Sequence, residues 1–167
     1  MENVVLKKSK IHGNGVFANR DFKKEETILL IDDSDVVTDT SKLTEKQLQF
    51  DCDFLANGKV VLMKEPERSI NHSCDPNTYV KTINGIRHVL AMKGIRKGEE
   101  VTYDYAVNGD NEGTFICHCG SKNCRKVYQG NFFKLPKEIQ IKYLPFLEDW
   151  FAKQFSGELE KLRKVLK

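Results

Sequence analysis

The sequence predicts a mainly β domain with short helices, and two observations carry that prediction. Asn-Gly pairs at residues 57–58 and 84–85 each lie between two short segments rich in apolar and β-branched residues, which is the pattern of a tight hairpin. Near the C-terminus, apolar residues instead recur at steps of three and four, which is typical of amphipathic helices. At 167 residues the chain has the size of one domain and can bury a core without disulfides.

The two Asn-Gly pairs define the predicted hairpins. Asparagine and glycine tolerate the positive φ that a two-residue hairpin turn requires. The strand pairs expected are residues 51–56 with 59–63 and residues 78–83 with 86–90.

Prolines and an apolar stripe locate the predicted helices. Pro136 suits the first turn of a helix and Pro145 ends it, because proline has no amide hydrogen to donate inside a helix. A shorter helical stretch is expected at residues 44–50. The stripe after Pro145 is expected to pack against the body of the domain, with partner binding as the alternative, and Gly157 is expected to divide it into two helices. Its members are Leu147, Trp150, Phe151, Phe155, Leu159, Leu162 and Leu166.

Charge and hydropathy exclude several classes of protein. A net charge of +3 without a basic stripe argues against direct nucleic-acid binding. The longest apolar runs are far shorter than the ~20 residues of a membrane span, and the first residues lack the pattern of a secretory signal. We therefore expect no membrane partner and an intracellular protein, cytoplasmic in a microbe or nuclear in a eukaryote. Residues 32–53 hold seven acidic residues and two lysines, which suits either a solvated face or the binding of a basic ligand.

The five cysteines are unevenly placed, which favours a metal site over disulfides. Cys117, Cys119 and Cys124 form a C-x-C-x4-C pattern that supplies three ligands of a tetrahedral zinc ion. Candidates for the fourth ligand are His118, Cys52 and Cys74. A remote cysteine is favoured, because His118 lies between two ligands and would have to bend back sharply. The alternative is a group of reduced, buried cysteines.

Two polar segments carry further candidate residues. Residues 68–77 read R-S-I-N-H-S-C-D-P-N and residues 98–105 read G-E-E-V-T-Y-D-Y. The first segment suits a loop that binds a ligand or satisfies its own backbone. On a strand, Tyr103 and Tyr105 would point to the same side, where they either pack or line a channel.

In this order, these segments resemble the SET domain of protein-lysine methyltransferases. The matching motifs are the glycine-bearing segment at residues 11–18, N-H-S-C-x-P-N at 71–77, G-E-E-x-T-Y-D-Y at 98–105 and the cysteine cluster, which resembles the post-SET motif. The resemblance spans residues 5–125, and the part from residue 132 onward resembles small stand-alone microbial members. Ser69 and Lys126 depart from the pattern, since the family usually has an aromatic residue and a glycine there.

The resemblance implies a fold of small sheets with a pseudoknot, where the last strand threads under a loop. It divides the chain into a SET domain at residues 1–113, a post-SET zinc segment at 114–130 and a C-terminal helical extension at 131–167. It also implies methyl transfer from S-adenosylmethionine to lysine side chains of a protein substrate. The expected substrate is a basic protein or peptide, such as a histone or another chromatin-like or ribosomal protein.

The resemblance also assigns roles to individual residues. Tyr105 is expected to be the catalytic tyrosine, and Tyr103 to limit how many methyl groups fit, with monomethyl-lysine as the main product. Zinc is expected on Cys74, Cys117, Cys119 and Cys124, with Cys52 free. The residues expected at the cofactor are Gly13, Asn14, Gly15, Phe17, Asn71, His72, Tyr105, Phe115 and Ile116.

Other functions remain as alternatives. A zinc-stabilised protein-binding module with this fold and no catalysis is the main one, although the presence of Asn71, His72 and Tyr105 argues against it. A zinc-cluster nucleic-acid binder is disfavoured by the low net charge. A Rossmann-type methyltransferase is disfavoured because the predicted hairpins do not suit a parallel sheet.

Overall fold

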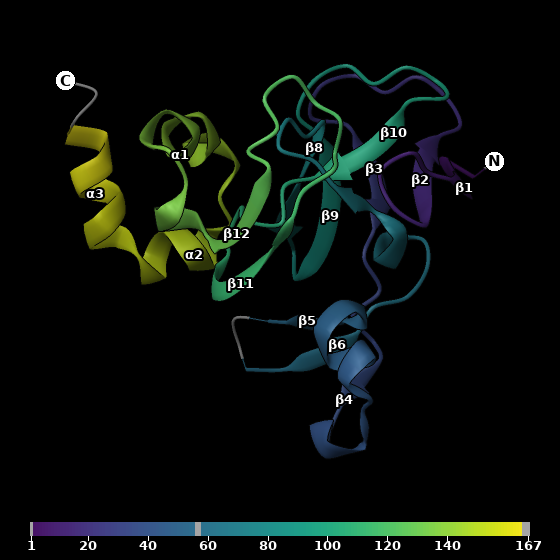
Figure 1. Cartoon of the computed structure of the whole chain (residues 1–167), viewed down its shortest axis with the longest axis horizontal. Coiled ribbons are helices and arrows are strands. Elements are labelled where there is room, and N and C mark those ends of the chain that lie inside the picture. The colour runs from purple at the N-terminus through teal and green to yellow at the C-terminus, as the bar shows by residue number, and fades with distance from the viewer. Residues whose placement is uncertain (1, 56–57, 165–167) are drawn as a thin grey trace.

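The computed structural model describes residues 2–55 and 58–164, and it confirms a mainly β fold with short helices. Figure 1 shows small sheets near the N-terminus, a group of helices near the C-terminus at the opposite end, and a three-stranded sheet that projects away from both. Strands β11 and β12 lie between the first sheets and the helices (Figure 1). No helix among the described residues is long and apolar enough to cross a membrane.

Within residues 2–55 and 58–164 the strands form four sheets, of two to four strands each. The first has the order β1 (Val4–Lys8), β2 (Asn14–Ala18), β10 (Glu100–Tyr103) and β7 (Asn71–His72). The second has the order β3 (Thr27–Leu30), β9 (Ile86–Ala91) and β8 (Thr78–Ile83). The projecting sheet has the order β4 (Val36–Val37), β6 (Val60–Leu62) and β5 (Cys52–Phe54), and the fourth pairs β11 (Asp110–Ile116) with β12 (Val127–Asn131).

Both predicted hairpins are confirmed. Strands β8 and β9 pair along their whole length, and the turn residues Asn84 and Gly85 have φ values of 52° and 79°, as a tight hairpin turn requires. Strands β5 and β6 also pair antiparallel, and Asn57 of their turn lies outside the described residues. These contacts form locally, so the sequence alone could predict them.

The first sheet depends on contacts between residues far apart in the chain. Strand β10 pairs antiparallel with β2 and parallel with β7, where Thr102 lies opposite Asn71 and Tyr103 opposite His72. The Ser73 amide then donates to the Tyr103 carbonyl at 2.9 Å. The two polar segments of the sequence therefore meet side by side.

The helices largely follow the prediction, with two differences. The stretch at residues 44–50 contains a single π-helical turn, Gln47–Asp51. The stripe divides at Phe155 rather than at Gly157, which lies in the first turn of the next helix. The division falls there because Phe155 leaves the helical conformation, with φ −106° and ψ 30°, while Gly157 has no positive φ that would end a helix. The α-helices are α1 (Lys137–Tyr143), α2 (Asp149–Gln154) and α3 (Ser156–Lys164), and the 3₁₀ turns are Thr40–Lys42, Glu67–Ser69, Phe132–Lys134 and Leu144–Phe146.

The C-terminal helices share one hydrophobic core with the end of the β region. Phe132, Tyr143, Phe151 and Leu159 are fully buried, and Val107, which follows β10, lies in the same cluster. The stripe therefore packs against the body as predicted, except that Leu166 lies outside the described residues. Strands β11 and β12 cross the predicted boundaries at residues 113 and 130, and the division into three segments stays a prediction.

Glu148 fixes the helices to the second sheet. Its carboxylate, only 4% exposed, accepts hydrogen bonds from the Thr82 amide at 2.8 Å and the Thr82 hydroxyl at 3.0 Å. The Glu148 amide donates to the side chain of Asn108 at 2.8 Å. The neighbouring Asp149 pairs with Lys81 but is 89% exposed.

We predict that Glu148→Ala lowers the free energy of unfolding by about 2 kcal/mol, because it removes a buried carboxylate together with its two hydrogen bonds to Thr82, and hydrogen bonds to charged groups contribute more than neutral ones. Asp149→Ala is the matched control. It should lower the free energy of unfolding by less than about 1 kcal/mol, since exposed ion pairs contribute little to stability. Urea denaturation of the three proteins measures both changes. Equal losses for the two variants would show that Glu148 does not anchor the helices.

Candidate functional site

Asn71 connects the first polar segment to the glycine-bearing loop. Its side-chain amide lies 3.1 Å from the His12 carbonyl, 3.0 Å from the Asn14 carbonyl and 2.8 Å from a carboxylate oxygen of Glu100. All three are acceptors, so the amide nitrogen donates to them. The structure thereby brings Asn71 together with the loop that holds Gly13, Asn14 and Gly15.

Glu100 explains why one of these positions is glycine. Its carboxylate accepts from the Ser9 hydroxyl at 2.7 Å and from Asn71. A Cβ atom added to Gly15 would lie 2.3 Å from the Glu100 carboxylate oxygen, so a larger residue would displace this contact. Gly13 has a φ of +48°, which L-amino acids with side chains rarely adopt.

His72 is a buried neutral imidazole at the crossing of the two segments. The Tyr105 amide donates to His72 Nδ1 at 3.3 Å, so Nδ1 is the acceptor and the proton is on Nε2. Nε2 lies 3.5 Å from the Cys74 sulfur. Burial lowers the pKa of His72 to about 4, although nearby Asp104 opposes that shift.

The two tyrosines lie close together, but not through strand alternation. Strand β10 ends at Tyr103, and the chain then turns because the Asp104 side chain and backbone accept from the Ala106 and Val107 amides at 3.1 and 2.9 Å. The prediction that both tyrosines lie on one strand is therefore wrong. Their rings are nevertheless only 6.2 Å apart between centroids.

Each tyrosine hydroxyl donates to a backbone carbonyl. Tyr103 donates to the Val107 carbonyl and Tyr105 to the Ile70 carbonyl, both at 2.7 Å. Burial raises the pKa of both phenols above the ordinary value, so both keep their protons at neutral pH. Their oxygen lone pairs are left to accept from a third group.

Asp104 lies between the tyrosines and has no exposed surface. Its two carboxylate oxygens accept from the two terminal nitrogens of Arg125 at 2.8 and 3.0 Å, and one of them also accepts from the Tyr143 hydroxyl at 2.9 Å. A buried carboxylate needs such partners, because its hydration is lost. The sequence analysis assigned no role to Asp104, Arg125 or Tyr143.

Aromatic rings surround His72. Phe115 meets it edge-on at 5.7 Å between ring centroids, Tyr128 at 5.2 Å, and Phe115 and Tyr128 stack at 4.5 Å. The pairing of β11 with β12 places Phe115 opposite Tyr128, a contact that the separate motifs did not indicate. Phe115 remains 42% exposed, so it has ring surface to offer a planar ligand.

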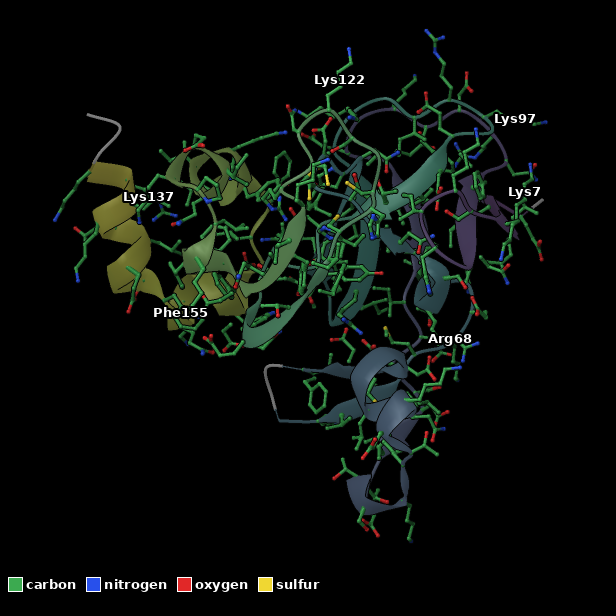
Figure 2. The ribbon with its side chains drawn as sticks, viewed as in Figure 1. Lys7, Arg68, Lys97, Lys122, Lys137 and Phe155 are labelled. Atoms are coloured by element: carbon green, nitrogen blue, oxygen red, sulfur yellow. The ribbon has the colours of Figure 1, made fainter. Side chains whose placement is uncertain are left out.

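Four cysteine sulfurs form a compact group. The Sγ atoms of Cys74, Cys117, Cys119 and Cys124 all lie within 4.8 Å of one another, and Figure 2 shows sulfur atoms gathered beneath the loop that carries Lys122. In a tetrahedral zinc site with Zn–S distances of ~2.3 Å, neighbouring sulfurs are about 3.8 Å apart. The Cys74 and Cys117 sulfurs are 3.7 Å apart, so the group fits a zinc ion.

The surroundings of the sulfurs shift the pKa values of the thiols in different directions. Burial raises the pKa of Cys74 to about 11 and that of Cys117 above the ordinary value. Burial acts in the same direction on Cys119, but hydrogen bonds from the Cys74 amide and Ser121 outweigh it and lower the Cys119 pKa to about 6. A bound metal ion would replace the protons on the remaining thiols.

Several candidate residues lie outside this arrangement. His118 is exposed, and Cys52 belongs to β5 of the projecting sheet. Phe17 is half-buried beside Lys7, whose ammonium lies 5.8 Å from its ring. Ile116 is 66% exposed and lines a cavity of about 410 Å³ together with residues of the cysteine segment. That cavity does not include Asn71 or the glycine-bearing loop.

Comparison with known proteins agrees with the geometry. Residues 13–106 match the model of the SET domain. The human Histone-lysine N-methyltransferase 2D is 34% identical over 137 residues, and the Drosophila melanogaster Histone-lysine N-methyltransferase trr is 35% identical over the same length. Each alignment covers 74% of this chain but only 2% of the human protein and 6% of the fly protein.

A solved structure also resembles this one. It is the crystal structure of a Plasmodium falciparum protein named for a proposed histone methyltransferase activity, with a TM-score of 0.51 and 25% sequence identity. The alignment covers 63% of this chain and 94% of the other. With more than half of its residues matching the SET-domain model, and with both signature segments crossing beside a four-cysteine group, the chain belongs to the SET-domain family.

Proposed function

We propose that the protein is a protein-lysine N-methyltransferase that uses S-adenosylmethionine. The observation that carries the proposal is that Asn71 contacts the glycine-bearing loop while the adjacent His72 contacts Tyr105, in a chain of the SET-domain family. Relatives named as histone-lysine methyltransferases support the same chemistry. The finer assignments below are part of this proposal.

The cofactor would be held between the glycine-bearing loop and the segment that contains Asn71 and His72. When bound, S-adenosylmethionine supplies a methyl group on a positively charged sulfur. Backbone groups of Gly13, Asn14 and Gly15 would bind its polar end, with Phe17 beside them. The exposed part of the Phe115 ring suits its adenine, with Ile116 next to it. The aromatic rings around His72 suit a cation, because a ring face attracts positive charge.

The tyrosines would act by position rather than as bases. The raised pKa of Tyr105 keeps its hydroxyl protonated, so it is unsuited to remove a proton from the lysine. Because its proton is donated to the Ile70 carbonyl, its oxygen can accept from the incoming amine and fix the line of attack. Such alignment supplies a large part of the rate of a two-centre reaction.

A basic protein is the proposed substrate, with histones as the first candidate. The acidic segment at residues 32–53 supports this only in part, because Asp32 pairs with Lys64 at 2.8 Å, and Asp33 and Asp53 both pair with Arg87 at 2.5 Å. Much of the segment's charge is thus neutralised within the protein. An intracellular location, where such substrates occur, belongs to the same proposal.

Tyr105→Phe should lower turnover about a hundredfold, as the loss of one positioned polar group at a reacting centre commonly does, while cofactor affinity stays within about threefold. The measurement is transfer from radiolabelled S-adenosylmethionine to core histones and to a lysate of the host, with calorimetry for cofactor binding. Tyr79→Phe is the control, because it removes a hydroxyl from β8, away from the site.

No transfer by the unmodified protein to any lysine would overturn the proposed activity and favour a catalytically inactive binding module. Equal loss of turnover and affinity in Tyr105→Phe would instead make Tyr105 a binding residue.

Tyr103→Phe should shift the product from mainly monomethyl-lysine to dimethyl-lysine. The Tyr103 hydroxyl is held against the Val107 carbonyl, where it would occupy space that a second methyl group needs. Mass spectrometry of a single-lysine histone peptide after long incubation measures the product. If the unmodified enzyme readily forms trimethyl-lysine, this crowding is absent. If Tyr103→Phe is less stable but forms the same product, Tyr103 is a packing residue.

Zinc is proposed on Cys74, Cys117, Cys119 and Cys124, and Cys74→Ser should lower both the zinc content and the cofactor affinity. Both effects are expected because Cys74 follows Asn71 and His72 in the same segment, and metal binding is coupled to folding. Elemental analysis and calorimetry measure the two quantities. Cys52→Ser is the control and should retain one zinc per chain. Purified protein without zinc would contradict the proposal.

A further inference from the structure

The last turn of α1 touches both signature segments at the point where they cross. Lys142 pairs with Asp75 at 3.1 Å, next to Cys74 in sequence. The Tyr143 hydroxyl donates to Asp104 at 2.9 Å, between Tyr103 and Tyr105. The Lys142 pair is exposed, whereas Tyr143 and Asp104 are fully buried, so the second contact is the one that fixes geometry.

Asp104 in turn determines the path of the backbone around the two tyrosines. Its side chain accepts from the Ala106 amide, and its carbonyl from the Val107 amide. The turn so formed presents the Val107 carbonyl to the Tyr103 hydroxyl and the Tyr105 amide to His72. A shift of the Asp104 carboxylate would therefore move both phenols.

Two side chains donate to this carboxylate from two different segments that follow β10. Arg125 follows the cysteine Cys124 directly, and Tyr143 comes from α1. Within the described chain, Tyr143 is thus the donor to Asp104 that the C-terminal helices supply. Burial raises the pKa of Tyr143, so its hydroxyl keeps the proton that it donates.

We propose that the C-terminal helices are part of the active site, and that Tyr143 is a positioning residue that acts through Asp104 on Tyr103 and Tyr105. The proposal rests on the methyltransferase function above. It assigns a catalytic contribution to a segment that lies outside the residues matched to the SET-domain model. A purely structural tyrosine would contribute only through the core in which its ring packs.

Tyr143→Phe separates the two roles, because it keeps the ring and removes only the hydroxyl. Turnover on core histones should fall about ten- to a hundredfold, as small displacements at a reacting centre do, with KM and cofactor affinity within about threefold. The amide resonances of Tyr105 and Ala106 in a ¹⁵N–¹H NMR spectrum should shift. The control is Phe151→Leu, which loosens the same core without a contact to Asp104.

Both variants are compared at a temperature at which circular dichroism shows them folded, lowered if Tyr143→Phe is unstable. Loss of turnover and shifted resonances in Tyr143→Phe, with neither in Phe151→Leu, support the proposal. Retained turnover in Tyr143→Phe, or equal effects in both variants, would overturn it. If the unmodified protein transfers no methyl group, the proposed methyltransferase function is wrong. The amide resonances of Tyr105 and Ala106 in Tyr143→Phe then decide whether Tyr143 positions the turn at Asp104.

Discussion

The structure depends most on the burial of the Asp104 carboxylate. A fully buried charge left without partners would cost about 3–5 kcal/mol, so every segment that supplies a donor must come to it. Those segments are the strand end itself, Arg125 after the cysteines, and Tyr143 of α1. One acidic residue thus joins the β region, the cysteine segment and the C-terminal helices, which lie 21 and 39 residues away in sequence.

Glu100, at the start of β10, has the matching role at the other side of the site. Glu100 accepts from Ser9 and Asn71 and leaves room only for glycine at position 15. Strand β10 therefore carries a carboxylate at its start and another just past its end, and these fix the glycine-bearing loop and the helices respectively. Tyr103 and Tyr105, which flank Asp104 in sequence, inherit their positions from both contacts, which is why the geometry of the site depends on distant parts of the chain.

The cysteine group lies in a part of the site that the two apolar clusters do not reach. Cys74, Cys117 and Cys119 form a buried cluster of their own, separate from the two apolar clusters. His72 Nε2 and the Arg125 amide both point at the Cys74 sulfur, at 3.5 and 3.4 Å. Such hydrogen bonds orient ligands in metal sites, so a metal bound here would be linked to His72 on one side and to Asp104, through Arg125, on the other.

The sequence by itself determined what depends on neighbouring residues. Asn84 and Gly85 fix the β8–β9 turn because both tolerate positive φ, Pro136 and Pro145 bound α1, and the spacing of Cys117, Cys119 and Cys124 predicts three ligands of one metal site. The motifs also identified Asn71, His72 and Tyr105, which the fold brings together. The family resemblance, rather than the cysteine spacing, pointed to Cys74 instead of Cys52, and the tertiary structure brings the Cys74 sulfur to the other three. Only the tertiary structure turned Tyr105 off the strand and placed Tyr143 on Asp104. The contacts of Cys74 with Cys117 and of Tyr143 with Asp104 span 43 and 39 residues, and the spacing of residues along a chain carries no information about which distant groups will meet when a charge is buried.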